Sequence, residues 1–282
     1  MSTLDLDLLQ SWEGREEINE DVITLPQVQM LASTLDHDPE EHLDGAILPP
    51  LYHWLYFLQP AKFSDLAPDG HAKKGVFMPP VPFPSRMFAG ARIDYLGDLR
   101  IGERVQRTST IQAVRYTEGR SGPLVFVTVA HKISNESSVA LVEEQDIAYR
   151  PKTTIRESAS GPETTMPETD FRREICPNES LLFQFSALTF NSHRIHYDLP
   201  YARSEGYPAL VVHGPLTAIL LADLVARECN RPELSYFSFR ARSPLYLGDQ
   251  INLTGQRVEN TVELTAFSAK GVASLNAQAV LR

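Results

Sequence analysis

The feature of this sequence that most limits its possible folds is an internal repeat. Residues 99–105 read LRIGERV, and residues 245–251, which lie 146 residues further along, read LYLGDQI. In both places a glycine and an acidic residue mark the turn into a long alternating run. The segments 139–147 and 272–280, which close the two halves, also match in the order and spacing of valine, alanine and glutamine. Because such a repeat determines the architecture, we interpret the chain as two similar units in tandem.

Each half combines a helical segment with long segments of alternating polar and apolar residues. Alternation of this length is typical of antiparallel strands. It predicts strands at 104–116, 124–133 and 139–150 in the first half, and at 236–242, 250–259, 262–268 and 272–281 in the second. Apolar residues at helical spacing predict helices at 26–36 and 213–229. The second helix is apolar almost all round, so we expect it to be enclosed by the sheet.

Four other segments have a less regular pattern. The apolar, aromatic run 51–58 is expected in a core, and the polar segment 11–21 is expected to form a short helix. Residues 60–90 are rich in proline and glycine and predict a long irregular loop, a feature that is often functional. The apolar run 181–190 is interpreted as a strand.

The boundary between the units is expected in a segment without hydrophobic periodicity. Residues 151–172 are rich in threonine, serine, proline and glutamate, which is typical of a linker. The prediction is therefore an N-terminal domain at 1–150 and a C-terminal domain at 173–282. Each would be an α+β unit whose antiparallel sheet wraps around a central helix, the plan of the hot-dog fold. Two such units side by side make a double hot-dog fold, with ligand sites at the seam between them.

Composition excludes several classes of function. The formal net charge of −10 argues against a nucleic-acid partner, which would need a basic surface. No apolar run approaches the roughly 18 residues of a membrane-spanning helix, and the acidic N-terminus does not resemble a targeting peptide. The two cysteines, Cys176 and Cys229, are interpreted as free thiols in a reducing compartment. We therefore expect a cytoplasmic protein with no membrane partner.

Three of the eight histidines, His193, His196 and His213, lie within 21 residues. A metal site is the first possibility to test. Pro200 and Gly206 argue against one helix that presents these side chains together, and the segment has no carboxylate or cysteine set at ligand spacing. The prediction is therefore that no metal is bound here.

General acid–base chemistry suits the segment better, because histidine works near neutral pH. Gly214 is expected to open the buried helix, where backbone N–H groups are free donors. A thioester carbonyl placed there would be polarised, and a developing enolate would be stabilised. Glycine would also let the ligand approach the backbone closely. We predict His196 as the general base and the Gly214 N–H as the oxyanion donor.

The same residues resemble a known family, the MaoC-like hydratases and dehydratases of acyl-CoA thioesters. That family's motif has an acid, an Asn two residues later, a catalytic His five residues after the acid, and then a His-Gly at a helix start. His196 and Gly214 stand at the positions of the catalytic His and the oxyanion Gly. Asn191 stands where the acid is usual and His193 where the Asn is usual. Asn191 cannot accept a proton, although it could orient a water.

The resemblance is strongest to the two-domain branch that includes the itaconyl-CoA and mesaconyl-CoA hydratases and the type 2 hydroxyacyl-thioester dehydratases. It is carried by FNSHRIHYD at 190–198 and EGYPALVVHGPL at 205–216. The first half contributes PPLYHW at 49–54, FMPPVP at 77–82 and RMFAG at 86–90. The resemblance implies hydration of a short branched or dicarboxylic enoyl-CoA such as itaconyl-CoA or mesaconyl-CoA. It implies no cofactor beyond the coenzyme A of the substrate, and a homodimer is expected.

The expected site combines catalytic and substrate-binding positions. The catalytic candidates are His196, Asn191, Asp198 and Gly214; those for substrate binding are Arg86, Met87, Phe88, His193, Arg194, Val212, His213 and Arg240. On a strand, Asp198 would share a face with His196 and could orient the imidazole or pass on a proton; alternatively, it simply begins the next turn. Arg86 is a candidate for contact with a substrate carboxylate or a phosphate of coenzyme A, because arginine binds both in a bidentate manner; alternatively, it is a surface arginine.

Each of these residues also has a purely structural interpretation. His213 could be a helix cap or packing residue, Asn191 a turn former, and Arg194 a solvated side chain. At the level of function, three alternatives remain open. They are a 3-hydroxyacyl-thioester dehydratase of fatty-acid synthesis, an acyl-CoA thioesterase and a non-catalytic acyl-CoA binder.

Overall fold

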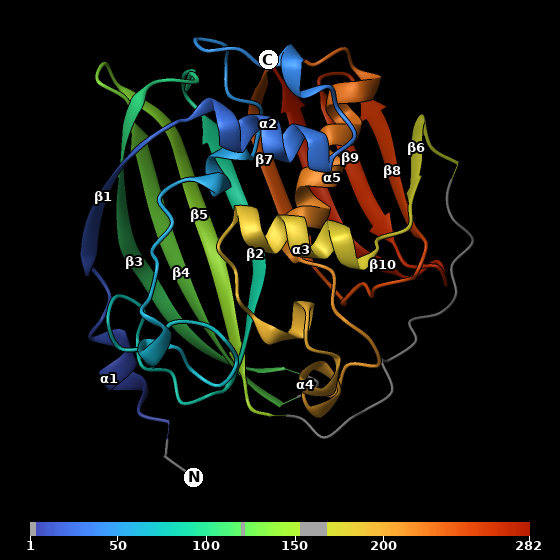
Figure 1. The fold of residues 1–282 in the computed structure, drawn as a ribbon. Coiled ribbons are helices and arrows are strands. Elements are labelled where there is room, and N and C mark those ends of the chain that lie inside the picture. Colours follow the sequence, from blue (N-terminus) through green and yellow to red (C-terminus); the bar gives the residue numbers. More distant parts are fainter. Residues whose placement is uncertain (1–3, 120–121, 153–167) are drawn as a thin grey trace.

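A computed structural model of the chain describes residues 4–119, 122–152 and 168–282. Its strands form one continuous antiparallel sheet in the order β1-β3-β4-β5-β2-β7-β10-β9-β8-β6 (Figure 1). The strands are β1 (Glu16–Val22), β2 (Ser85–Tyr95), β3 (Arg104–Gly119), β4 (Gly122–Ser134), β5 (Val139–Arg150), β6 (Phe171–Ile175), β7 (Leu234–Ala241), β8 (Ile251–Val258), β9 (Thr261–Phe267) and β10 (Ala273–Leu281).

The helices connect these strands or cover the sheet. The α-helices are α1 (Leu6–Gln10), α2 (Leu25–Thr34), α3 (Glu179–Leu188), α4 (Leu199–Ser204) and α5 (Gly214–Glu228). Four short 3-10 turns are η1 (Pro39–Glu41), η2 (Tyr52–Leu55), η3 (Phe63–Asp65) and η4 (Arg194–His196). None of the helices in the described ranges is long and apolar enough to cross a membrane.

The strand order reflects the repeat in the sequence. The first half contributes β1-β3-β4-β5-β2, and the second half contributes its corresponding strands in reverse order, β7-β10-β9-β8-β6. The halves join where β2 pairs with β7, from Gly90 opposite Arg240 to Asp94 opposite Tyr236. The two repeated sequence segments lead into β3 and β8, which hold equivalent places in the two halves. The predicted α+β architecture with long antiparallel strands is therefore confirmed.

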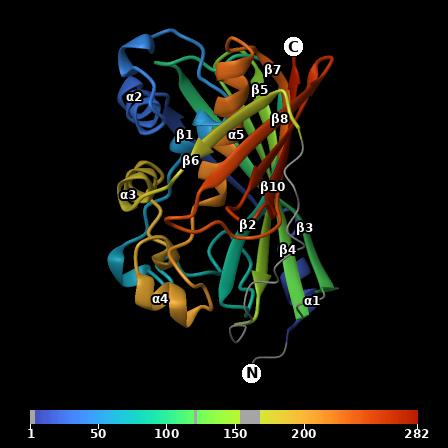
Figure 2. The ribbon, with the colours of Figure 1, turned by 90° about the vertical axis from the view of Figure 1, so that its right-hand side faces the viewer.

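Helix α5 is the central helix of the second half. It lies against β8, β9 and β10, and every residue from Leu216 to Val225 is buried. Helices α2 and α3 contact each other and lie on the same side of the sheet, farther from it than α5 (Figure 2). The helix predicted at 213–229 is confirmed to within one residue at each end, because an apolar helix of this kind requires enclosure.

The run 181–190, interpreted above as a strand, is instead α3. Asn178 caps the helix by accepting a hydrogen bond from the backbone N–H of Leu181, and Glu179 adds an acid to the first turn. Leu182 and Phe185, three residues apart, are the buried positions, so the run has a helical rather than an alternating period. The strand prediction gave too much weight to apolar content and overlooked the cap.

Two further expectations about the first half were wrong. The short helix expected at 11–21 is replaced in part by β1, an edge strand that pairs with β3. The irregular loop expected at 60–90 ends earlier, because β2 begins at Ser85, and so Arg86 to Phe88 lie on a strand. Of the linker predicted at 151–172, residues 153–167 lie outside the described residues, and β6 already begins at Phe171.

The two halves share a large apolar core, and a second, smaller apolar cluster lies within the first half. The run 51–58 is largely buried, as predicted, with Leu51, Tyr52, Leu55, Tyr56 and Phe57 at most 5% exposed. Across the seam, the rings of Trp54, Phe88 and Phe239 pack edge to face, with centroids 5.3 to 6.0 Å apart. Such aromatic pairs add about 0.5–1.5 kcal/mol each beyond the area that they bury. The seam is thus a part of the core, and it fixes the first half relative to α5.

A buried carboxylate connects α5 to its surroundings. Asp223 accepts hydrogen bonds from Arg173 of β6 (2.6 Å) and from Arg227 one turn further along α5 (2.8 Å), and it also pairs with His37. Its side chain is only 5% exposed. Arg227 in turn donates to the carbonyl oxygen of Leu35, just after α2. This network ties both halves to the C-terminal part of α5.

Replacing Asp223 by asparagine should lower the free energy of unfolding by about 2–3 kcal/mol, because Arg173 and Arg227 would lose their compensating charge. Urea unfolding followed by circular dichroism measures the change. The matched control is Glu174→Gln at the exposed Arg172–Glu174 pair, where we expect a change below about 0.5 kcal/mol. Equal losses in the two variants would contradict a stabilising role for the network.

Candidate active site

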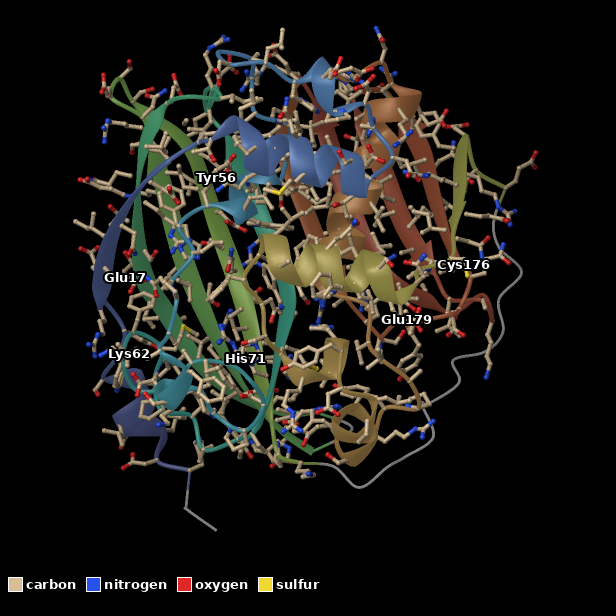
Figure 3. All side chains as sticks on the ribbon, viewed as in Figure 1. Glu17, Tyr56, Lys62, His71, Cys176 and Glu179 are labelled. Carbon is tan, nitrogen blue, oxygen red and sulfur yellow. The ribbon has the colours of Figure 1, made fainter. Side chains whose placement is uncertain are left out.

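Four histidine rings form a row at the N-terminal end of α5. The ring centroids of His71 and His193 are 4.3 Å apart, those of His193 and His196 are 5.5 Å apart, and those of His196 and His213 are 3.6 Å apart. His193 precedes η4, and His196 is the last residue of η4. His71 comes from the first-half loop between η3 and β2 (Figure 3). The three histidines of the second half thus come together, and a fourth joins them.

The orientation of His196 is fixed by the backbone. Its Nδ1 lies 2.7 Å from the carbonyl oxygen of Val211, and since a carbonyl only accepts, Nδ1 carries the proton. Nε2 is then the free, basic nitrogen of the neutral ring. The ring stacks on His213 at an interplanar angle of 19° and is 8% exposed. His196 therefore presents one basic nitrogen from a largely buried position.

His213 supports this stack. It stands at the cap position of α5, but its side chain makes no capping hydrogen bond. Its Nε2 lies 2.8 Å from the Ser186 hydroxyl, and its ring packs edge to face on Phe185. Its Nδ1 is buried and has no hydrogen-bond partner among the described residues. Of the two structural interpretations given above, the geometry supports packing rather than capping.

Burial keeps these imidazoles neutral. It lowers the pKa of His196 to about 3, although the hydrogen bond to Val211 acts in the opposite direction. Burial likewise lowers the pKa of His193 to about 3 and that of His213 well below the ordinary value. At neutral pH each ring therefore has a free lone pair, which a general base requires.

Gly214 lies beside the stacked rings of His196 and His213, directly after His213 in the chain. It is the first residue of α5, a helix of 15 residues, and Pro215 follows it in the first turn. The N–H groups of a first turn have no partners within the helix, and the helix dipole adds positive potential there. A Cβ at this position would meet the carbonyl oxygen of Phe88 at 3.7 Å, so the residue faces the first half. The geometry suits a polarised carbonyl oxygen next to a neutral imidazole.

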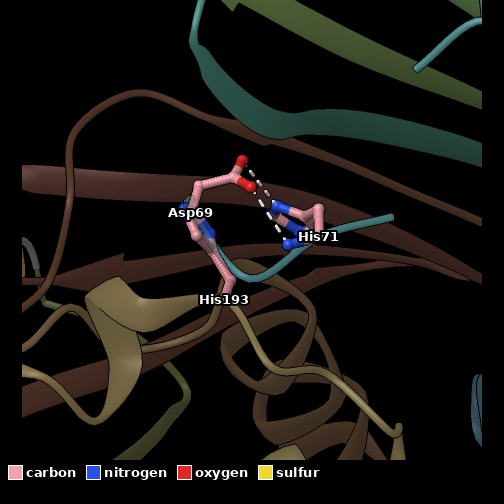
Figure 4. Close-up of side chains that lie close together, drawn as sticks. All are labelled: Asp69, His71 and His193. Carbon is pink, nitrogen blue, oxygen red and sulfur yellow. Dashed lines mark hydrogen bonds and ion pairs between the residues drawn. The ribbon is translucent and has the colours of Figure 1, made fainter. Parts of the chain in front are cut away.

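Sequence reasoning missed two residues of this site, Asp69 and His71. The Nδ1 of His71 lies 3.1 Å from one carboxylate oxygen of Asp69, and the backbone N–H of His71 donates to the other at 3.0 Å (Figure 4). Burial alone would raise the pKa of Asp69, but the hydrogen bonds and charge of His71 outweigh it and bring the pKa to about 2. The only sequence signal for these two residues was the long irregular segment 60–90. Its length indicated a functional loop but not which of its residues are functional.

The loop that carries Asp69 and His71 is attached to the segment that carries His193 and His196. The backbone N–H of Arg194 donates to the carbonyl oxygen of Asp69 at 2.9 Å, and the Ser192 hydroxyl donates to that of Gly70 at 2.5 Å. A Cβ at Gly70 would overlap the carbonyl oxygen of Ser192, and its φ of +94° also favours glycine. Close contact between the two halves at this point therefore depends on Gly70.

The sequence argument against a metal assumed that no carboxylate accompanies the histidines, and that assumption was wrong. One ligand atom from each of Asp69, His71 and His193 lies within 4.8 Å of the others, a proximity that a metal site would also need. The Nδ1 of His71 and a carboxylate oxygen of Asp69 already form a hydrogen bond with each other. The absence of a bound metal stays a prediction.

The structure gives several predicted catalytic residues other partners. The side-chain oxygen of Asn191 accepts the backbone N–H of His193 at 3.0 Å, which makes it a turn former. Asp198 is not on a strand, since it caps α4 through the N–H of Tyr201 and pairs with Arg194 at 2.7 Å. Of the two interpretations of Asp198, the structure supports the start of a turn, and the strand on which a contact with His196 depended is absent. Arg194 also donates to the carbonyl oxygen of Pro68, so it is held by the protein.

Three predicted substrate-binding residues have other surroundings than a substrate pocket. Strand alternation places Met87 on the opposite face of β2 from Arg86 and Phe88. Arg240 is exposed on β7, on the opposite face from the buried Phe239. Val212 is 3% exposed and belongs to the core. Met87 and Arg240 thus point away from His196, whereas Val212 is next to it through Val211 and His213 but is buried in the core.

Arg86 and Phe88 remain next to the site. The charge of Arg86 contributes to lowering the pKa of both His71 and His193, after the larger effect of burial, and strand alternation places its side chain on the same face of β2 as Phe88. Among the described residues, no carboxylate forms an ion pair with Arg86. Phe88 packs on Trp54 and Phe239, and its carbonyl faces Gly214. The first half thus contributes a half-buried cation and an apolar wall.

A separate hollow lies at the other end of α5. This cavity of about 410 Å³ is lined by residues of both halves, among them His42, Tyr52, Ala226 and Arg231. It contains none of the predicted site residues. Because it lies next to the C-terminal turn of α5, it is distinct from the histidine row at the N-terminal end.

Comparison with known proteins identifies relatives along almost the whole chain. The family described as hydroxyacyl-thioester dehydratase type 2 matches residues 51–247, which include parts of both halves. A Chloroflexus aurantiacus protein named mesaconyl-C(4)-CoA hydratase is 43% identical over 268 residues, which make up 95% of each chain.

Solved structures agree on the fold. A MaoC-like dehydratase from Phytophthora capsici superposes with a TM-score of 0.75 at 13% identity and covers 99% of this chain and 98% of its own. A Mycobacterium tuberculosis protein described as a double hot-dog fold superposes with a TM-score of 0.59 at 12% identity and covers 96% of each chain. The predicted double hot-dog fold is confirmed, and so is the resemblance to MaoC-like hydro-lyases. The chain belongs to the hydroxyacyl-thioester dehydratase type 2 family.

Proposed function

We propose that this protein catalyses the reversible hydration of a short branched or dicarboxylic enoyl-CoA thioester, with mesaconyl-CoA and itaconyl-CoA as the candidate substrates. The observation that carries the proposal is the neutral imidazole of His196 beside the helix start at Gly214. The 43% identity to a mesaconyl-C(4)-CoA hydratase supports the substrate class. Dehydration of the product is the same chemistry in reverse.

The proposed step uses both groups. The thioester carbonyl accepts a hydrogen bond from the N–H of Gly214. As the oxygen of a water molecule bonds to the β-carbon, one of its protons passes to Nε2 of His196. The electrons of the double bond move through the α-carbon to the carbonyl oxygen, where the helix start stabilises the enolate. Delivery of a proton to the α-carbon completes the addition of water.

Arg86 suits the second carboxylate of such a substrate. In mesaconyl-CoA joined through C4, the β-carbon carries a methyl group and a carboxylate, and the product is a citramalyl-type thioester. A guanidinium near His71 and His193 would face that carboxylate while Gly214 holds the carbonyl. Phe88 would contact the apolar part of the acyl group. No organic cofactor is needed, and the homodimer and cytoplasmic location expected from the sequence remain part of this proposal.

The family match also favours a second candidate, the dehydration of 3-hydroxyacyl thioesters of fatty-acid synthesis. The two reactions differ in the acyl group rather than in the chemistry. A comparison of mesaconyl-CoA with crotonyl-CoA therefore separates them, and release of free thiol would indicate a thioesterase. Binding of a thioester without any turnover would indicate a non-catalytic binder.

Replacing His196 by alanine should lower kcat for hydration by about 10²-fold or more, because the general base would be lost. Loss of the conjugated enoyl chromophore of mesaconyl-CoA measures the rate, and mass spectrometry of the product confirms the gain of water. The matched control is His42→Ala in the cavity at the other end of α5, which should change kcat less than about twofold. Full activity of His196→Ala would remove His196 from the mechanism.

Replacing Arg86 by glutamine should discriminate between substrates. Loss of a hydrogen bond to a charged group costs about 1.5–3 kcal/mol, which corresponds to a fall in kcat/KM of about 10- to 100-fold for mesaconyl-CoA. Crotonyl-CoA, which has no second carboxylate, should be affected much less. Arg240→Gln, on the outer face of β7, is the matched control. A uniform loss with both thioesters would show that Arg86 does not select the carboxylate.

As the pH falls through 6.5, kcat should not show the decrease that protonation of an ordinary catalytic histidine would cause. Since burial lowers the pKa of His196 to about 3, the base stays neutral as the pH falls through 6.5. Activity is present above the pKa of the folded protein and is lost only below it. We expect kcat at saturating mesaconyl-CoA to change less than about twofold between about pH 7.5 and 5.5. An acid limb with an apparent pKa near 6.5 would contradict this assignment.

A further inference from the structure

Hydration removes one proton from water and adds one proton to the α-carbon. Between these two steps a group of the protein must carry a proton, and His196 is poorly placed to do so for long. Its Nδ1 is committed to the carbonyl of Val211, and its ring is buried against His213. A buried imidazolium with only a neutral carbonyl as its partner is costly. Asp198, the nearest acid in the sequence, is occupied by Arg194 and by the start of α4. The site therefore needs another group to hold the proton.

Asp69 and His71 have the properties of such a group. The Nδ1–H of His71 donates to the carboxylate of Asp69, which directs the Nε2 of His71 elsewhere as the free nitrogen. A carboxylate partner stabilises an imidazolium far better than a carbonyl does. The side chains of His71 and Asp69 are 24% and 17% exposed, so the pair is more accessible than His196.

The pair is also fixed in relation to the base. The ring of His193 lies between the rings of His71 and His196, at centroid distances of 4.3 and 5.5 Å. The hydrogen bonds from Arg194 to Asp69 and from Ser192 to Gly70 hold the loop against the catalytic segment. A group attached in this way stays in register with His196 while the substrate enters and leaves.

We propose that Asp69 and His71 form a second acid–base pair of this active site, contributed by the first half, and that it holds the proton in transit during hydration. The water O–H bond breaks as oxygen bonds to the β-carbon, and the proton reaches Nε2 of His196. It passes to one ring nitrogen of His193 and from that same nitrogen to Nε2 of His71, where Asp69 stabilises the charge. The N–H bond then breaks as the C–H bond at the α-carbon forms, and every group returns to its starting state. His71 is the acid–base residue, and Asp69 is its positioning residue.

This inference rests on the proposed hydration, and the test uses the full-length chain with mesaconyl-CoA. Asp69→Asn should lower kcat by about 10- to 100-fold and leave KM within about threefold, the pattern expected when a partner of a reacting imidazole is lost. Asp65→Asn, an exposed carboxylate in the same loop, is the matched control and should leave kcat unchanged.

His71→Ala provides a readout that a structural role would not give. Imidazole in the buffer should raise the kcat of His71→Ala by about tenfold or more, because the missing group lies in a partly exposed position and acts by proton transfer. His42→Ala should show no such rescue. Circular dichroism and the urea midpoint show whether each variant is folded, and the Asp69→Asn result stands separately if His71→Ala is unstable. Dialysis against EDTA should leave the wild-type rate unchanged.

The outcomes separate the two proposals. If the wild type hydrates mesaconyl-CoA, His196→Ala is inactive, and Asp69→Asn and His71→Ala retain full kcat, then hydration stands and the second pair is overturned. A loss of kcat without imidazole rescue, in a folded His71→Ala, also overturns the acid–base role. A rate lost on EDTA treatment and restored by Zn²⁺ would assign Asp69 and His71 to a metal instead. A wild type that hydrates no thioester refutes the hydratase proposal itself, and the second pair falls with it.

Discussion

The enclosure of α5 is the constraint on which the rest of the structure depends. An apolar helix buried along ten consecutive residues must be surrounded, and the sheet and outer helices surround it. The same enclosure leaves its N-terminus, with Gly214, only partly exposed to water. Unpaired N–H groups in a site of low dielectric are stronger hydrogen-bond donors to a developing negative charge. The packing that stabilises the fold therefore also creates the candidate oxyanion site.

Duplication allows the two halves to differ. The second half has the 15-residue helix and three of the four histidines in the row, whereas the longest helix described in the first half has ten residues. In place of a second long helix, the first half contributes the loop that carries Asp69 and His71 and the strand that carries Arg86. The continuous sheet across β2 and β7 holds these parts in one rigid relation. A site at the seam can then draw charge from one half and the base from the other.

The histidines of the row are all largely desolvated, but their hydrogen-bond partners differ. These partners determine which ring can accept a proton and which can keep it. His196 faces a carbonyl, His213 a hydroxyl, and His71 a carboxylate. Burial disfavours the charged form of each ring, and only His71 has an ionised group that offsets it directly. Neutral rings suit proton abstraction, and a ring paired with a carboxylate suits retention of the proton.

The sequence by itself determined the duplicated architecture, the long strands, the buried helix at 213–229, and His196 and Gly214 as a candidate pair. These features depend on periodicity and short-range spacing, which a sequence shows directly. It misassigned α3, where the Asn178 cap outweighed an apolar run, and it placed Asp198 beside His196 by assuming a strand. Only the tertiary structure brought Asp69 and His71 to a histidine more than a hundred residues away, through backbone hydrogen bonds between two loops. Such contacts depend on loop conformation and on the absence of a side chain at Gly70, neither of which has a periodic signal in the sequence.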